Sequence, residues 1–165
     1  MPVSDQGVSL DRAMLIPRVL IFLRRGEQVL LLKGAPDMRL WAGKYNGVGG
    51  HVEAGEDILS AARRELLEET GLTADLWLCG TAAVDTGTNP GIGLYIFSGE
   101  CLSGEPKASA EGTLEWVSME EIPRLPVVED LPVLLGRVWK MKRGDVPFHA
   151  RSFYEREKLK VVFAN

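Results

Sequence analysis

The sequence predicts an α/β fold in which a mixed β-sheet is flanked by helices on both faces. Short segments rich in Val, Ile, Leu, Tyr and Phe alternate with turn residues, as expected of strands. Two longer segments, residues 57–70 and 130–141, carry apolar side chains at helical spacing. Strands and helices mix without regular alternation, which favours a mixed sheet. The strands are expected at residues 17–23, 28–32, 76–84, 92–102, 113–117, 148–154 and 160–164.

In the N-terminal half, the first two strands form a hairpin around the turn Arg25-Gly26-Glu27. A loop at residues 34–44 leads into residues 45–52, which contain three glycines. Glycine in such an extended segment indicates a bulge or a close approach of the backbone to a ligand. The first helix begins near Asp57, a favourable N-cap, and ends at Thr70, because Gly71 suits the left-handed position that follows a helix.

In the C-terminal half, the turn DTGTNPG connects two strands, and a polar loop at residues 103–112 follows. After the short strand 113–117, residues 119–122 form one helical turn before Pro123. Pro132 fits the first turn of the second helix. The last two segments are expected to form a hairpin.

Length and composition fit one soluble domain spanning residues 1–165, with residues 1–14 as a loosely ordered start. Apolar residues make up 45% and charged residues 25%, and no apolar run reaches membrane-spanning length. The net charge is −4 and the longest basic cluster is the short segment 140–143, so a nucleic-acid polymer is not expected as a partner. A small phosphorylated substrate remains possible, since metal ions could neutralise its charge.

The expected compartment is the cytoplasm. The N-terminal segment lacks the apolar core of a signal peptide, and two cysteines are too few for a disulfide framework. The protein is expected to be a monomer or a homodimer.

The helix at residues 57–70 carries a cluster of acids. Measured from Glu65 at about 100° per residue, Glu68 lies about 60° to one side and Glu69 about 40° to the other. These three acids therefore share one face, while Arg64 can form an ion pair with Glu68. Glu56, at the helix entry, can pair with Arg64 or Arg63.

Such a cluster repels itself unless a cation neutralises it. An ordinary solvated acidic face is the alternative, but the preceding segment GGHVEAGE favours a metal site. Hard cations bind oxygen ligands, and Mg²⁺ typically takes a few carboxylates together with substrate phosphates. Mg²⁺ is therefore the expected ion, with Mn²⁺ as a substitute.

Residues 50–72 resemble the signature of the Nudix hydrolase family, G-x5-E-x7-R-E-U-x-E-E-x-G-U with U aliphatic. The match covers every specified position: Gly50, Glu56, Arg64, Glu65, Leu66, Glu68, Glu69, Gly71 and Leu72. The resemblance implies an α/β/α sandwich and hydrolysis of nucleoside diphosphates linked to another group.

The resemblance also implies roles for individual residues. Glu65, Glu68, Glu69 and the Gly49 carbonyl would bind metal, and Glu56 with Arg64 would be the orienting pair. One carboxylate must act as general base on the attacking water, and Glu65 and Glu69 are both candidates. A loop glutamate serves in some members, and Glu111 is the expected loop acid, either at the metal site or on the plain surface.

Three further segments resemble the 8-oxo-dGTP diphosphatase (MutT-like) branch of the family: residues 41–50, 111–117 and 125–129. By this resemblance Asn46 would recognise the base, since an amide offers a donor and an acceptor to a purine edge. The alternative is that Asn46 is a turn residue before Gly47. Trp41 and Tyr45 are stacking candidates, and Glu129 and Asp130 would reach the base. Val128 departs from the branch, because many members carry a base-stacking Trp there.

Three functions remain open. The first is Mg²⁺-dependent hydrolysis of a nucleoside triphosphate, such as 8-oxo-dGTP, to nucleoside monophosphate and pyrophosphate. The second is hydrolysis of ADP-ribose or another nucleoside diphosphate derivative, which the short segment of about 15 residues before the first strand disfavours. The third is a non-catalytic nucleotide sensor, which the complete set of acids and the lack of an extension after Asn165 disfavour.

Overall fold

The computed structural model describes residues 2, 6–7, 9, 11–107 and 111–164. Of the segment 1–14, expected to be loosely ordered, residues 1, 3–5, 8 and 10 lie outside this description. The elements follow the order β1 Leu15–Arg25, β2 Gln28–Gly34, β3 Tyr45–Asn46, α1 Ile58–Thr70, β4 Trp77–Val84, β5 Gly91–Glu100, β6 Gly112–Ser118, the 3₁₀ turn η2 Ile122–Arg124, α2 Leu131–Trp139, β7 Phe148–Glu155 and β8 Lys158–Phe163.

These strands form one mixed sheet in the order β3-β2-β1-β5-β4-β7-β8, and β6 pairs with β2 off this path. The central strands β1 and β5 run parallel, while the hairpins β1–β2, β4–β5 and β7–β8 are antiparallel. Residues 19–23 of β1 are buried without alternation. A strand covered on both faces needs such a continuous apolar run.

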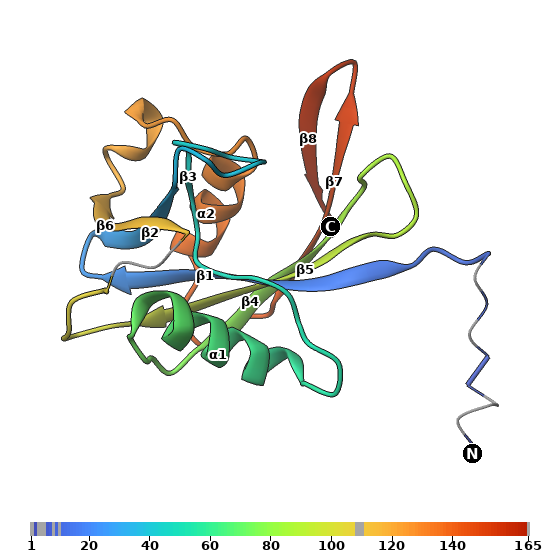
Figure 1. Cartoon of the computed structure of the whole chain (residues 1–165), viewed down its shortest axis with the longest axis horizontal. Helices are drawn as coiled ribbons and strands as arrows, with labels where there is room; N and C mark the ends of the chain where they lie inside the picture. The colour runs from blue at the N-terminus through green and yellow to red at the C-terminus, as the bar shows by residue number, and fades with distance from the viewer. Residues whose placement is uncertain (1, 3–5, 8, 10, 108–110, 165) are drawn as a thin grey trace.

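The two helices cover opposite faces of the sheet (Figure 1). Helix α1 packs through Ala61, Ala62 and Leu66 against side chains of β1 that include Ile21. Helix α2 packs through residues that include Leu134 on the other face. The predicted fold class, a mixed sheet between helices, is therefore confirmed. Neither helix in the described part of the chain is long and apolar enough to cross a membrane.

Helix α1 has the ends that its sequence predicts. The Asp57 carboxylate accepts hydrogen bonds from the backbone N–H groups of Leu59 and Ser60, both at 2.9 Å. Gly71 adopts a left-handed conformation with φ of 69°, and its N–H donates to the Leu67 carbonyl. These contacts satisfy groups that helix ends otherwise leave without partners, so the ends of α1 are fixed.

Several predicted segments differ in extent, and the helical turn expected at residues 119–122 lies instead at Ile122–Arg124 and includes Pro123. Helix α2 ends at Trp139, two residues before the expected end at residue 141. Strand β3 contains two residues, and the chain then runs beside β1 with isolated bridges at Val48 and His51. Gly49 makes this approach possible, because a Cβ there would lie 2.1 Å from the Val19 carbonyl oxygen.

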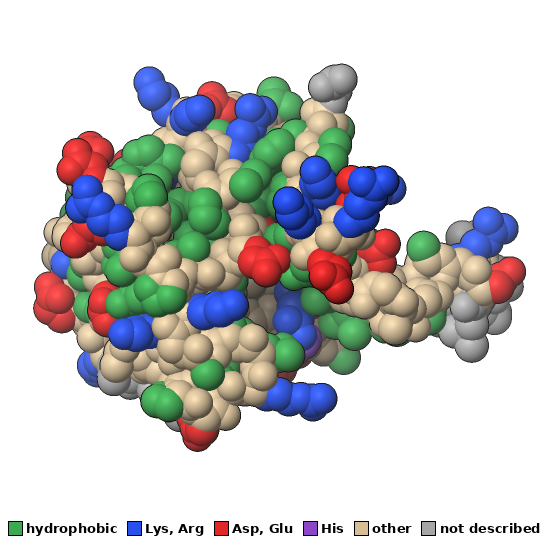
Figure 2. Space-filling view, turned by 90° about the horizontal axis from the view of Figure 1, so that it is seen from above, with side chains coloured by type: hydrophobic (Ala, Val, Ile, Leu, Met, Phe, Trp, Pro, Cys, Tyr) green, Lys and Arg blue, Asp and Glu red, His purple; other side chains and the backbone are tan. Residues whose placement is uncertain are grey.

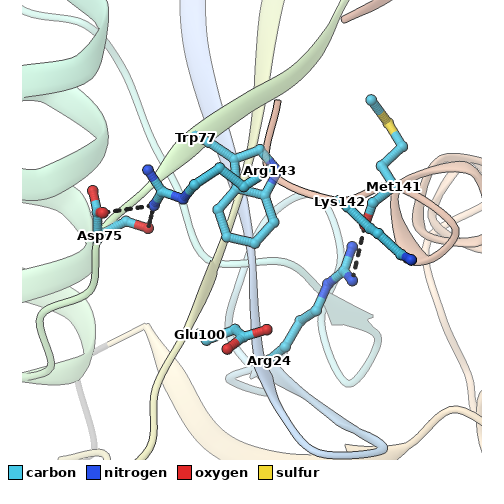
Figure 3. A pocket seen from close by; sticks show the side chains of 7 residues that line it. All are labelled: Arg24, Asp75, Trp77, Glu100, Met141, Lys142 and Arg143. Atoms are coloured by element: carbon cyan, nitrogen blue, oxygen red, sulfur yellow. Dashed lines mark hydrogen bonds and ion pairs between the residues drawn. The ribbon is translucent and has the colours of Figure 1, made fainter. Parts of the chain in front are cut away.

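Arg24, at the end of β1, closes the C-terminal end of α2. Its guanidinium donates to the carbonyls of Val138, Trp139 and Met141. Figure 3 shows this side chain beside Trp77 in a cavity of about 380 Å³, on whose other side Arg143 forms an ion pair with Asp75. A cation suits the negative end of a helix, so Arg24 ties β1 to α2.

Candidate active site at helix α1 and the glycine-rich segment

Arg64 lies at the centre of the acidic cluster on α1. Its Nε and Nη2 donate to both oxygens of Glu56, at 2.9 and 3.0 Å. Its Nη1 donates to Glu65 at 2.9 Å and to Glu68 at 3.1 Å. The predicted pairs with Glu56 and Glu68 are present, and the contact with Glu65 is an addition. Arg64 therefore orients three carboxylates at once.

The electrostatics follow this network. Hydrogen bonds from Arg64 hold the pKa of Glu56 below its ordinary value, although Glu56 is also partly shielded from water. The same bonds, first to Glu56 and then to Glu65, raise the pKa of Arg64. This group is consequently fully charged at neutral pH.

Glu69 lies on the inner side of the cluster and has a different environment. Its side chain is buried, with 8% exposed, and accepts a hydrogen bond from the Gly49 backbone N–H at 3.2 Å. It also shares a hydrogen bond with the carboxyl of Glu111. Burial first, and then the charge of Glu111, raise the pKa of Glu69 to about 8. The structure thus brings Glu111 to the acids of α1.

Gly50 lies against the carboxyl group of Glu65. A Cβ at this position would lie 2.6 Å from the carboxyl atoms of Glu65. No side chain can therefore replace this glycine without displacing Glu65. The glycines of the signature segment make room for β1 on one side and for a carboxylate on the other.

The donor set fits a hard divalent cation. Glu65, Glu68, Glu69 and Glu111 supply carboxylate oxygens, and no Lys or Arg among the described residues forms an ion pair with Glu69. Within the described ranges, no three acidic, histidine or cysteine side chains already converge on one point. Arg64 explains this arrangement, because it draws Glu65 and Glu68 toward itself.

A cavity of about 280 Å³ is lined by Glu111, which shares a hydrogen bond with Glu69, and by predicted base-binding residues. Gly49, Gly50 and Glu111 line it together with Trp41 and Asn46. Figure 2 views the face away from α1 and shows a hollow near its middle, with acidic and basic side chains around it. Asn46 accepts a hydrogen bond from Gly47 N–H through Oδ1, at 2.8 Å. Its amide nitrogen has no acceptor among the described residues and is available to a ligand.

A second cavity of about 240 Å³ shares Leu40 and Trp41 with the first. Glu129 and Asp130 line it together with Tyr154 of β7. The Tyr154 hydroxyl donates to Glu129 at 2.9 Å, and burial raises the pKa of Asp130. The two acids thus lie beside Trp41, although in a separate cavity from Asn46.

Tyr45 requires a correction. We expected its ring to stack on a base, but it lies in the core on the α2 side with 5% exposed. Its hydroxyl donates to Glu115 at 2.7 Å. Neighbouring residues of a strand face opposite sides, so Tyr45 and Asn46 cannot both face the cavity.

Arg18 was not among the predicted site residues, yet it lines the same cavity as Asn46 and Glu111. Within the predicted strand at residues 17–23 it is the single charged residue, although the observed strand β1 also contains Arg24 and Arg25. His51, at the end of the glycine-rich segment, also lines this cavity.

A family model for the NUDIX domain matches residues 14–136. The chain belongs to the Nudix family. This assignment agrees with the acids of α1 and the preceding glycines, which form the most distinctive part of the sequence.

Among similar proteins, the oxidized purine nucleoside triphosphate hydrolase of Danio rerio is 41% identical over 95 residues, which cover 56% of this chain and 61% of that protein. The protein of the same description from Mus musculus is 36% identical over 106 residues, covering 63% and 67%. The chain thus spans about three fifths to two thirds of these relatives. The structure of a MutT protein from Bacillus halodurans superposes with a TM-score of 0.75 at 28% identity, covering 90% of this chain and 97% of that one.

Proposed function

We propose that this Nudix protein hydrolyses a nucleoside triphosphate to the monophosphate and pyrophosphate, with Mg²⁺ bound by Glu65, Glu68, Glu69, Glu111 and the Gly49 carbonyl. The single observation that carries the proposal is the cavity that connects Glu111 and Gly49 to Asn46 and Trp41. A small molecule in this cavity would have access both to Glu111, which shares a hydrogen bond with Glu69, and to the Asn46 amide. The names of the relatives in Danio rerio and Mus musculus support an oxidised purine as the preferred base.

Each group of the site would contribute separately. Bound Mg²⁺ would neutralise phosphate charge and acidify a water molecule. Arg64 holds the carboxylates of Glu56, Glu65 and Glu68 in place through its forked hydrogen bonds. Glu65, Glu69 and Glu111 are the candidates for the base that removes a proton from the attacking water. At the other end, the Asn46 amide would donate to the purine edge and Trp41 would stack on the ring.

A phosphate-release assay across a nucleotide panel tests the proposal. The panel contains dGTP, 8-oxo-dGTP, ATP and ADP-ribose, each with and without Mg²⁺. Phosphate that appears only after coupling with inorganic pyrophosphatase marks cleavage of a triphosphate to pyrophosphate. Phosphate that requires a phosphatase, with ADP-ribose as substrate, marks the second function considered from the sequence.

Two variants provide controls. Glu69→Gln should retain the fold and lose most activity, whereas Glu120→Gln, at an exposed position outside both cavities, should retain it. Absence of release from every substrate would contradict the proposal and favour a non-catalytic sensor. Equal turnover by Glu69→Gln and the wild type would contradict the assignment of the site.

A further inference from the structure

Arg18 is a half-buried cation that lines the same cavity as Asn46 and Glu111. It lies on β1, where its backbone pairs with Leu94 of β5 on one side and forms an isolated bridge with His51 on the other. The next residue on the same face, Leu20, lines the same cavity. The backbone position of Arg18 is therefore fixed from both sides.

The guanidinium is held by one contact. Its Nε donates to Nε2 of His51 at 3.1 Å. The two terminal nitrogens have no acceptor among the described residues. Because Nε is already bound, these terminal N–H groups are the ones left to bind a ligand.

Other half-buried arginines of this protein do not share this property. Arg24 donates to three carbonyls of α2, and Arg25 donates to the carbonyls of Cys101 and Gly104 and to Glu105. Arg64 donates to three carboxylates. The terminal guanidinium nitrogens of these three arginines donate to protein acceptors. Those of Arg18 have no such acceptor among the described residues, and Arg18 lines a cavity.

The residues around Arg18 indicate the charge of a ligand that its terminal nitrogens would bind. Among the described residues that line this cavity, Arg18 is the one lysine or arginine, and it lies within the same enclosure as Gly50 and Asn46. A guanidinium fork matches the oxygens of a phosphate in two parallel hydrogen bonds. An anion held there would share the cavity with the Asn46 amide and with Glu111.

We propose that Arg18 binds the phosphate attached to the nucleoside, the one retained in the monophosphate product, and that His51 is a positioning residue for its guanidinium. This inference rests on the proposed function, because it assumes a nucleotide in the cavity. In this arrangement the positive charge that contacts the phosphate belongs to the protein, so the contact does not require a bound metal ion. Binding of a nucleoside monophosphate to metal-free protein should therefore depend on Arg18.

The test is calorimetry in EDTA with 8-oxo-dGMP and with its nucleoside, 8-oxo-deoxyguanosine. Wild-type protein should bind the monophosphate more tightly than the nucleoside. Arg18→Gln should weaken monophosphate binding by about tenfold or more, the usual effect of losing charge-assisted hydrogen bonds. Its affinity for the nucleoside should not change, which also verifies that the cavity is intact.

Further variants separate positioning from charge. His51→Gln keeps an acceptor for Arg18 and should retain monophosphate affinity, whereas His51→Ala should lose part of it. Arg18→Lys keeps the charge without the fork and should give an intermediate value. Arg124→Gln is the matched control, because Arg124 is exposed and lines neither cavity of the site.

The possible outcomes are distinguishable. Equal monophosphate affinity of Arg18→Gln and the wild type would overturn the inference, as would the absence of monophosphate binding by the wild type. If the wild type hydrolyses triphosphates and Arg18→Gln shows no loss of monophosphate affinity, only the inference fails. If binding depends on Arg18 but no nucleotide is hydrolysed, the anion site stands and the proposed function fails.

Discussion

Replacement of Glu69 by Gln should stabilise the metal-free protein at neutral pH. Burial and the neighbouring Glu111 raise the pKa of Glu69 from 4.5 to about 8 in the folded protein. Between these two values the folded state binds more protons at Glu69 than the unfolded chain does, so the contribution of Glu69 to stability is greatest below pH 4.5 and falls as the pH rises toward 8. Gln keeps an acceptor for the Gly49 N–H and carries no charge.

The size of the Glu69 contribution to the free energy of unfolding follows from the same pKa shift. Between pH 5 and pH 7.5 the Glu69 contribution falls by about 3 kcal/mol. For a domain of this size that corresponds to roughly 6–12 °C in melting temperature. In EDTA, the wild type and Glu69→Gln should melt at similar temperatures at pH 5, and the variant should melt higher at pH 7.5.

Thermal denaturation followed by circular dichroism, from pH 5 to pH 8 in EDTA, measures this difference. Glu120→Gln, on the exposed surface, should follow the wild-type curve. Addition of Mg²⁺ should raise the melting temperature of the wild type more than that of Glu69→Gln, because the variant lacks a proposed ligand. Parallel pH curves for wild type and variant in EDTA would refute the electrostatic reasoning.

Three further changes have defined outcomes. Gly50→Ala should reduce kcat at least about tenfold with a modest loss of stability, because its Cβ displaces Glu65; steady-state kinetics and a melting curve check this. Arg64→Lys should reduce kcat by a similar factor, since an ammonium cannot reproduce the forked bonds; unchanged kcat would contradict its orienting role. Tyr154→Phe removes the hydroxyl that binds Glu129, so KM for a purine triphosphate should rise about fivefold while kcat stays constant; a fall in kcat alone would contradict this assignment.

Local signals made helix α1 predictable from the sequence. Asp57 and Gly71 define its ends, and the three- and four-residue spacing of its acids defines one face. The contacts of Arg64 with Glu56 and Glu68 follow from that spacing as well. These features depend on residues close together in the chain.

Features set by long-range pairing were not predictable in the same way. The pairing of β6 with β2, and of β7 with β4, depends on how the sheet closes around its core. The choice between Tyr45 and Asn46 for the cavity depends on which face of β3 is buried, and a shift of one residue would reverse it. Arg18 lines the cavity because β1 pairs with β5 and with the segment around His51. Sequence patterns within β1 alone do not predict this placement.

The contact between Arg24 and the end of α2 has a consequence for the order of events during synthesis. The helix lacks a glycine C-cap, and the residue that satisfies its last carbonyls precedes Val138 by 114 positions. Strand β1 leaves the ribosome long before α2 exists, so a nascent chain arrested before residue 138 holds Arg24 without these acceptors. Conversely, a fragment that begins after β1 lacks the Arg24 donors at the end of α2, so Arg24→Met measures how much these hydrogen bonds contribute to the stability of the folded protein.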